Sequence, residues 1–138
     1  MYGYVKVGSA VPKLRVADCV YNKEEILKLV EAAAAKQVRV LSFPELSVTG
    51  YTCADLFFQT PLLHAAEQAI QEIAEATEAL NIFLLIGAPI AVDNQMFNCA
   101  VALYKGKLLG IVPKTHIPNY SEFYEAVSYT HLTLPTIA

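Results

Sequence analysis

Two short apolar runs, each closed by a proline, constrain the fold of this chain more than any other feature. Residues 38–43 and 82–88 are rich in β-forming side chains and end before Pro44 and Pro89. Runs of this length and composition indicate buried strands, and a proline disfavours continuing them. We therefore expect each of these strands to be buried on both faces and to end at its proline.

A stretch with helical periodicity precedes each apolar run. Asn22 followed three residues later by Glu25 resembles a capping box, and apolar positions continue from there to residue 35. Thr60 is a suitable N-cap with Pro61 at the first helical position, and the apolar face continues to about Leu80. The sequence thus predicts two helices that alternate with the strands.

The remaining segments complete the predicted order of elements. Asp93 and Asn94 indicate a turn before the next strand, and Lys105-Gly106 has the composition of a two-residue hairpin loop. The expected order is an opening strand leading into a loop near residue 19, helix 22–35, strand 38–43, loop 46–59 with a helical turn at 54–58, helix 60–80, and strands 82–88, 97–104 and 108–112. This order predicts an α/β fold with a mixed sheet.

Composition excludes several classes of function. The 138 residues are 55% hydrophobic and 17% charged, so the chain should fold around a core. The net charge of −3 and the lack of a basic face argue against nucleic acid as a partner. No apolar run approaches the ~20 residues that span a bilayer, and the N-terminus lacks a signal segment, so we expect a cytoplasmic protein without membrane contact.

The residues that suggest chemistry are Glu45 and Lys114, each directly after a predicted strand. Glu45 lies in Phe43-Pro44-Glu45-Leu46, followed by Thr49-Gly50-Tyr51, and Lys114 lies in the string PKTHIPNY of residues 113–120. These strings resemble the glutamate and lysine motifs of the carbon-nitrogen hydrolase (nitrilase) superfamily. The resemblance implies the first half of an α-β-β-α sandwich and a Glu-Lys-Cys triad, in which Glu45 is the general base and Lys114 stabilises the oxyanion.

Such a triad is chemically reasonable. A thiol with a pKa of about 8.5 is mostly neutral at pH 7, so a neighbouring carboxylate is needed to accept its proton during attack on an amide carbon. A fixed ammonium group then stabilises the oxyanion of the tetrahedral intermediate. Two strand ends can bring such groups together from distant parts of the sequence.

A finer resemblance concerns the strings YTCADLF at residues 51–57 and IPNYSEFYE at residues 117–125. They are similar to the glutaminase domains of glutamine-dependent NAD synthetases. This implies glutamine as substrate, ammonia delivered to a fused synthetase domain that uses ATP and Mg²⁺, and a homo-oligomer; no cofactor is implied for this segment itself. Tyr51 and Tyr120 would line the glutamine pocket, and either Glu122 or Glu125 would be an acid that supports the lysine.

The resemblance covers residues 1–125, and the tail 126–138 does not match the family pattern. We expect this tail to be foreign sequence. The family's nucleophilic cysteine follows the lysine, but Cys19, Cys53 and Cys99 all precede Lys114. Cys53 is near Glu45 in sequence, yet its position does not match the nucleophile, and Cys99 is predicted to be buried and inert. The chain as given should therefore not hydrolyse glutamine by itself.

Metal binding and two rival functions complete the expectations. His64 and His116 lack partners at metal-ligand spacing, and the cysteines are too widely separated for a zinc site or a disulfide framework, so we expect no metal. One rival is a stand-alone amidase or N-carbamoyl amide hydrolase with the same triad. The other is an inactive fragment or binding module in which the glutamate and lysine have lost their role.

Overall fold

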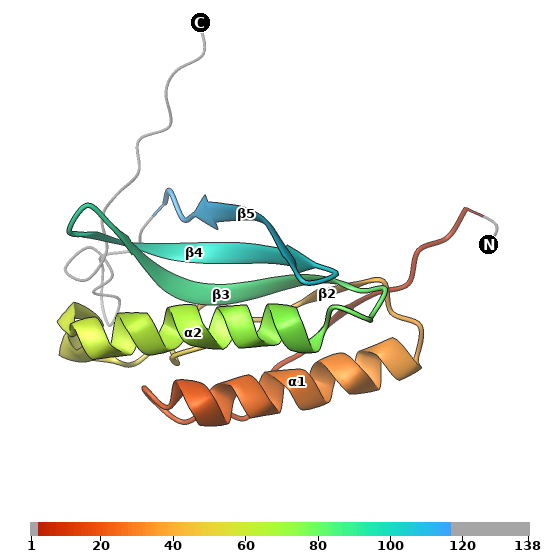
Figure 1. Ribbon diagram of the computed structural model, residues 1–138, viewed down its shortest axis with the longest axis horizontal. Coiled ribbons are helices and arrows are strands. Elements are labelled where there is room, and N and C mark those ends of the chain that lie inside the picture. The colour runs from red at the N-terminus through yellow and green to blue at the C-terminus, as the bar shows by residue number, and fades with distance from the viewer. Residues whose placement is uncertain (1–2, 117–138) are drawn as a thin grey trace, which may run out of the picture.

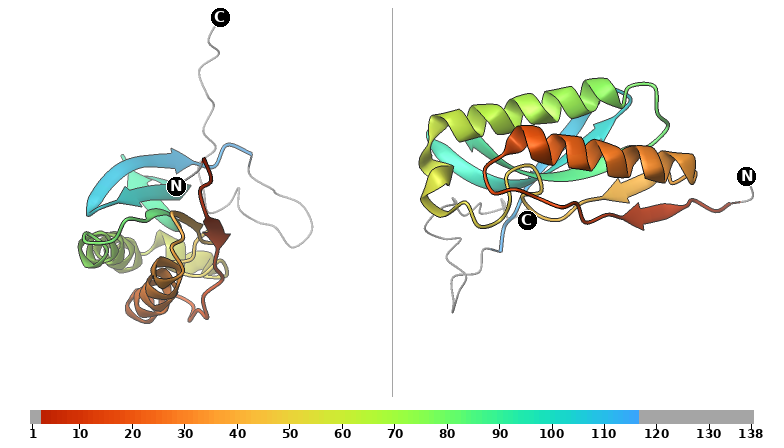
Figure 2. Two further views of the ribbon diagram at one scale, coloured as in Figure 1. Left: turned by 90° about the vertical axis from the view of Figure 1, so that its right-hand side faces the viewer. Right: turned by 90° about the horizontal axis from the view of Figure 1, so that it is seen from below.

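A five-stranded mixed sheet carries two helices on one of its faces (Figures 1 and 2). This is a computed structural model, and it describes residues 3–116. The elements are β1 (Val7–Ser9), α1 (Cys19–Ala35), β2 (Val40–Ser42), the 3₁₀ helix η1 (Ala54–Phe58), α2 (Thr60–Ala76), β3 (Phe83–Val92), β4 (Gln95–Tyr104) and β5 (Lys107–Pro113). Among the described residues, no helix is long and apolar enough to cross a membrane.

The order of strands in the sheet follows the order in the sequence. β1, β2 and β3 are parallel to one another, whereas β3, β4 and β5 form two successive antiparallel hairpins. The parallel pairs are connected through α1 and α2, as parallel strands require a crossover. The predicted α/β class, the mixed sheet and the order of the elements are confirmed.

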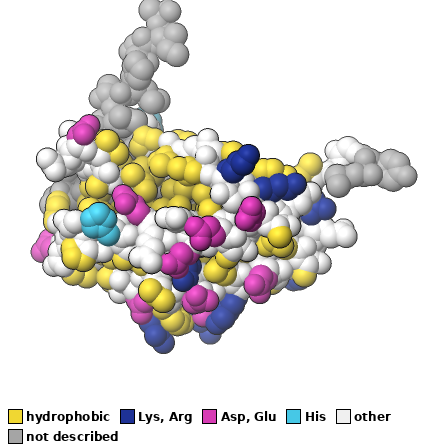
Figure 3. All heavy atoms as spheres, in the orientation of Figure 1, with side chains coloured by type: hydrophobic (Ala, Val, Ile, Leu, Met, Phe, Trp, Pro, Cys, Tyr) yellow, Lys and Arg dark blue, Asp and Glu magenta, His cyan; other side chains and the backbone are white. Residues whose placement is uncertain are grey.

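The hydrophobic core lies between the sheet and the two helices. Alternate residues of β3, such as Leu84 and Ile86, are fully buried on the helix side together with Val101 of β4. Residues of the opposite parity, including Leu85 and Gly87, belong to the other face, here called the open face. Figure 3 shows hydrophobic side chains gathered over the strands above α2.

β2 and the two edge strands of the sheet, β1 and β5, are incompletely covered. In β2 only Leu41 is fully buried, and its neighbours Val40 and Ser42 are half-buried, so burial of this strand on both faces was wrong. Apolar residues remain exposed on β1 and β5, among them Val7 at 66% and Val112 at 65%. These exposed residues leave the open face without a hydrophobic cover among residues 3–116.

The start of α1 differs from the predicted capping box. Asp18 is the N-cap, and its Oδ1 accepts a hydrogen bond from the backbone N–H of Tyr21 at 3.0 Å. Asn22 lies inside the helix, fully buried, where it bonds both backbone groups of Arg15 and the carbonyl of Val48. Asn22 therefore ties the loop before α1 to the loop after β2 instead of capping the helix.

The ends of α2 also differ from the prediction. Thr60 is the first helical residue and Gln59 is the N-cap, while Pro61 lies in the first turn as expected. The helix ends at Ala76, four residues before the predicted end. There the hydroxyl of Thr77 donates to the carbonyl of Ile73 at 2.8 Å, which satisfies a terminal acceptor and closes the helix.

β3 does not end before Pro89 but continues to Val92. Pro89 pairs with Asn98, whose backbone carbonyl accepts from Lys114 on the other side of β4. In an antiparallel strand, the N–H and C=O of one residue point toward the same neighbouring strand. The carbonyl of Asn98 points toward β5, so Asn98 and Pro89 do not bond each other and the nitrogen of Pro89 faces away from β4. β2 pairs only with residues 83–85, so the missing N–H of Pro89 removes no ladder hydrogen bond.

Both predicted turns are confirmed, and both join antiparallel strands. Asp93 and Asn94 have φ of 50° and 62°, and Lys105 and Gly106 have φ of 48° and 80°. Two consecutive left-handed residues define the turn that matches the twist of two antiparallel strands. The predicted helical turn at residues 54–58 is confirmed as η1.

Candidate functional site

Glu45 lies on a turn directly after β2, held tightly against the open face of β3. A Cβ atom added to Gly87 would lie 2.3 Å from the backbone nitrogen of Leu46 and 2.5 Å from the carbonyl oxygen of Pro44. Two hydrogen bonds secure this approach: Val48 N–H donates to the Gly87 carbonyl at 3.1 Å, and Gly87 N–H donates to the Ser47 hydroxyl at 3.3 Å. Only glycine fits at this position of β3.

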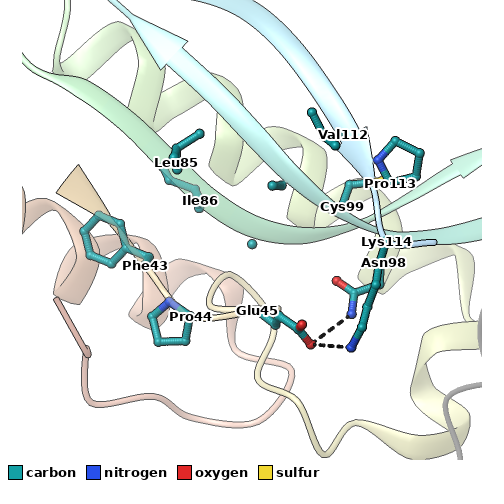
Figure 4. A pocket seen from close by; sticks show the side chains of 12 residues that line it. Phe43, Pro44, Glu45, Leu85, Ile86, Asn98, Cys99, Val112, Pro113 and Lys114 are labelled. Carbon is teal, nitrogen blue, oxygen red and sulfur yellow. Dashed lines mark hydrogen bonds and ion pairs between the residues drawn. The ribbon is translucent and has the colours of Figure 1, made fainter. Parts of the chain in front are cut away.

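Lys114 is placed by the sheet itself. It follows the last residue of β5, and its backbone N–H donates to the carbonyl of Asn98 at 2.7 Å, which continues the pairing of β5 with β4. Asn98 and Lys114 are therefore side by side on neighbouring strands. Their side chains can both reach the turn that carries Glu45 (Figure 4).

The two residues form an ion pair although 69 positions separate them in the sequence. Lys114 Nζ lies 3.0 Å from Glu45 Oε2, and Asn98 Nδ2 lies 3.4 Å from the same oxygen. The side chains of Glu45 and Lys114 are 51% and 25% exposed, whereas Asn98 is buried. The structure thus brings together Glu45 and Lys114, the carboxylate and the ammonium group that the sequence motifs single out.

A pocket of about 260 Å³ lies beside this ion pair. Its walls come from the turn around Glu45 and from β3, β4 and β5, with Leu85 and Val112 among the apolar residues (Figure 4). Its volume is slightly below that of typical small-molecule sites, which range from about 300 to 1,000 Å³. An apolar pocket with convergent charged groups at its edge is suited to a small polar ligand.

The ion pair contributes little to the stability of the fold. Exposed and half-exposed pairs of this kind contribute about 0–1 kcal/mol, because solvent screens the charges and two side chains lose freedom. The turn nevertheless requires a glycine in β3 and a buried asparagine in β4 at the same place. Because the ion pair itself stabilises the fold so little, a chemical role of Glu45 and Lys114 explains this arrangement better than stability does.

None of the three cysteines of the chain has the environment of a nucleophile. Burial raises the pKa of Cys99, which lines the pocket, to about 11, and raises that of Cys19 to the same value. Burial also raises the pKa of Cys53, whose thiol donates to the backbone carbonyls of Thr49 and Gly50. These thiols stay protonated at neutral pH.

The predicted binding residues are less well placed than the ion pair. Tyr51 is 39% exposed on the loop after Glu45 and is not among the residues that line the pocket. Its contact with substrate stays a prediction. Tyr120, Glu122 and Glu125, together with the tail 126–138, lie outside the described residues.

Potential metal ligands are scattered over the described part of the chain. Within residues 3–116, no three His, Cys, Asp or Glu side chains are close enough together to hold a metal ion. His64 has an exposed side chain near Glu67, and His116 is exposed. ATP and Mg²⁺, which the resemblance implies for a fused synthetase domain, stay a prediction.

Two residues of the site, Gly87 and Asn98, were not predicted from the sequence. Asn98 is a polar residue inside an apolar strand, and Gly87 interrupts the apolar run of β3. A buried polar side chain needs a partner, and a glycine inside a strand often marks a close backbone approach. Both signals were present in the sequence, but their partner, the turn at Glu45, becomes evident only in three dimensions.

Comparison with known proteins agrees with this geometry. The family model described as carbon-nitrogen hydrolase matches residues 6–136. The chain belongs to the carbon-nitrogen hydrolase family. The match extends past residue 125, where we expected the family pattern to end, and the boundary between domain and tail stays a prediction.

Curated relatives of this carbon-nitrogen hydrolase chain include glutamine-dependent NAD(+) synthetases. The protein of that name from Mycobacterium leprae is 35% identical over 123 residues, and the one from Aquifex aeolicus is 34% identical over 110 residues. These matches cover 89% and 80% of this chain but 18% and 19% of the relatives. The chain thus spans about a fifth of the length of the relatives it matches.

Solved structures show the same fold. A glutamine-dependent NAD(+) synthetase from Cytophaga hutchinsonii superimposes with a TM-score of 0.90 at 27% identity, covering 95% of this chain and 22% of that one. An amidase from Nesterenkonia sp. superimposes with a TM-score of 0.74 at 20% identity, covering 92% and 48%. The carbon-nitrogen hydrolase chain therefore matches part of the nitrilase-type fold in both proteins.

Proposed function

We propose that this chain is the N-terminal part of a glutamine-hydrolysing domain that supplies ammonia to an NAD synthetase. The observation that carries the proposal is the contact of 3.0 Å between Glu45 and Lys114 at the edge of an apolar pocket. Membership of the carbon-nitrogen hydrolase family and the names of the relatives support the choice of glutamine as substrate.

In the proposed reaction, a cysteine thiol attacks the side-chain amide carbon of glutamine. Glu45 accepts the thiol proton and returns it to the departing nitrogen, which leaves as ammonia. Lys114 stabilises the oxyanion of the tetrahedral intermediate with its positive charge. Water, deprotonated by Glu45, then attacks the thioester, and glutamate is released.

The nucleophile is the part of this proposal that residues 1–138 do not supply. The three cysteines precede Lys114 in the sequence, and burial keeps their thiols protonated. The family places its nucleophile after the lysine. We therefore propose that activity belongs to the longer protein that includes residues 1–125.

The test uses the complete reading frame that encodes residues 1–125, recovered from the source gene and expressed whole. We expect Glu45→Gln and Lys114→Met each to lower kcat for ammonia release from glutamine by at least 100-fold, because each removes a group that acts in the transition state. The exposed residues Glu31 and Lys107 provide the matched controls Glu31→Gln and Lys107→Met, which should keep full activity.

Three outcomes would change the proposal. Glutamine hydrolysis that survives both Glu45→Gln and Lys114→Met would refute the assigned roles of these two residues. A complete protein that releases no ammonia from glutamine or any other amide would favour an inactive fragment or binding module. Hydrolysis of simple amides or N-carbamoyl compounds in preference to glutamine, with no ATP-dependent amidation of deaminated NAD, would favour the stand-alone amidase. Added ammonia should restore NAD synthesis in the Glu45→Gln protein if a synthetase domain is fused.

A further inference from the structure

Asn98 is a buried polar residue in the middle of an otherwise apolar strand. It is 4% exposed, and its neighbours on β4 include the buried residues Met96, Cys99 and Val101. Burial of an amide side chain costs free energy unless hydrogen bonds compensate for the lost water. Its contacts therefore indicate why an amide is present here.

Asn98 contacts both members of the ion pair, through different groups. Its backbone carbonyl accepts from the Lys114 backbone N–H at 2.7 Å, and its side-chain Nδ2 donates to Glu45 Oε2 at 3.4 Å. The same carboxylate oxygen accepts from Lys114 Nζ at 3.0 Å. One oxygen atom thus accepts from both the ammonium group and the amide (Figure 4).

We propose that Asn98 is a positioning residue that fixes Glu45 and Lys114 relative to each other for the reaction. Its carbonyl sets the position at which Lys114 leaves β5, and its amide occupies one oxygen of the carboxylate. The other oxygen, Oε1, is then directed toward a substrate or nucleophile. This inference rests on the function proposed above and extends it to a residue that does not touch the reacting atoms.

An amide suits this task better than a charged or an apolar side chain. A leucine of similar size would remove the amide donor, so that Oε2 of Glu45 would keep the hydrogen bond from Lys114 but lose the one from residue 98. An aspartate would place a second negative charge beside Glu45, which repels the carboxylate and competes for Lys114. Asparagine donates a hydrogen bond without adding charge, so the net charge beside Glu45 and Lys114 is unchanged.

The kinetic test compares Asn98→Leu with Asn81→Leu in the complete protein. Asn81 is the matched control, because it is an exposed asparagine that accepts from the Tyr104 hydroxyl, away from the ion pair. We expect Asn98→Leu to lower kcat about 10- to 100-fold, the range for losing a hydrogen bond to a charged group, with KM nearly unchanged. In a Glu45→Gln background, Asn98→Leu should cause a much smaller further loss.

The outcomes separate this inference from the proposed function. If Glu45→Gln inactivates the enzyme but Asn98→Leu keeps kcat within twofold, Asn98 has no positioning role and the proposed function stands. If Asn98→Leu lowers kcat by the same factor in the protein with Glu45 and in the Glu45→Gln variant, the role of Asn98 is structural and the inference is overturned. Asn98→Ser, which keeps a short donor, should recover part of kcat.

A second measurement does not depend on activity. In the ¹⁵N-labelled 138-residue chain, the side-chain amide signals of Asn98 should shift when Glu45 is replaced by alanine, and those of Asn81 should not. Unchanged Asn98 signals would show that the amide does not contact the carboxylate, which would refute the inference whatever reaction the parent protein catalyses. Because this measurement keeps Asn98 and changes only Glu45, it still tests the inference if Asn98→Leu fails to fold.

Discussion

Gly87→Ala tests how the fold places Glu45. A methyl group at Gly87 would lie 2.3, 2.5 and 2.7 Å from backbone atoms of Leu46, Pro44 and Glu45. Ordinary van der Waals contacts to a Cβ begin at 3.4 Å. All three obstacles are backbone, so no flexible side chain can yield, and the turn has to move away from β3 by about 1 Å.

The cost of this movement can be worked out from the contacts. Forcing an extra methyl into a packed site costs about 1–3 kcal/mol. Separating the turn from β3 also weakens the Val48 to Gly87 hydrogen bond, worth about 1 kcal/mol. The lower entropy of alanine in the unfolded chain offsets about 0.4–1 kcal/mol. We therefore expect a net loss of about 1–3.5 kcal/mol in the free energy of unfolding, or roughly 4–15 °C in Tm.

Gly110→Ala is the matched control for this experiment. Gly110 also lies in a strand, β5, but an added Cβ would meet no atom within 4 Å. Thermal unfolding of the two variants should differ by several degrees, and in the complete protein Gly87→Ala should also lose about 100-fold in kcat because Glu45 is displaced. Equal melting temperatures and equal activities for the two variants would refute the argument.

Two further predictions concern buried groups. Asn22→Ala leaves both backbone groups of Arg15 and the carbonyl of Val48 without their partner, so urea titration should show a loss of about 2–4 kcal/mol; a loss below about 1 kcal/mol would contradict this assignment. The Cys99 thiol has a pKa raised to about 11 by burial, against about 8.5 when unfolded, so its contribution to the free energy of unfolding should be constant below about pH 8.5 and fall as the pH rises toward 11. Cys99→Ala should make this fall shallower, and an unchanged slope would contradict the burial argument.

Features of the fold that depend on neighbouring residues could be predicted from the sequence. The predictions of turns at Asp93-Asn94 and Lys105-Gly106 are confirmed, because two adjacent residues suited to positive φ determine such a turn locally. The order of strands and helices was correct for a similar reason, since each has its own periodicity. Glu45 and Lys114 were found through their motifs, and the structure places them in contact.

Features that depend on distant partners were missed or misjudged. Asn22 was taken for a helix cap because its contact with Val48, 26 residues away, is invisible in the local pattern. Pro89 was taken for a strand end because the side to which its nitrogen points depends on the pairing with β4. Asn98 was overlooked because an isolated polar residue in a strand acquires meaning only from the carboxylate it meets.

The sequence distance between Glu45 and Lys114 has a consequence for folding. β3, β4 and β5 are joined by two-residue turns, and such hairpins form within about 1–10 μs. The parallel pairing of β2 with β3 instead requires α2 to form and cross over first, and contacts of long sequence separation form slowly. We therefore expect Lys114 and Asn98 to come together before Glu45 joins them, because the ion pair also needs the crossover through α2.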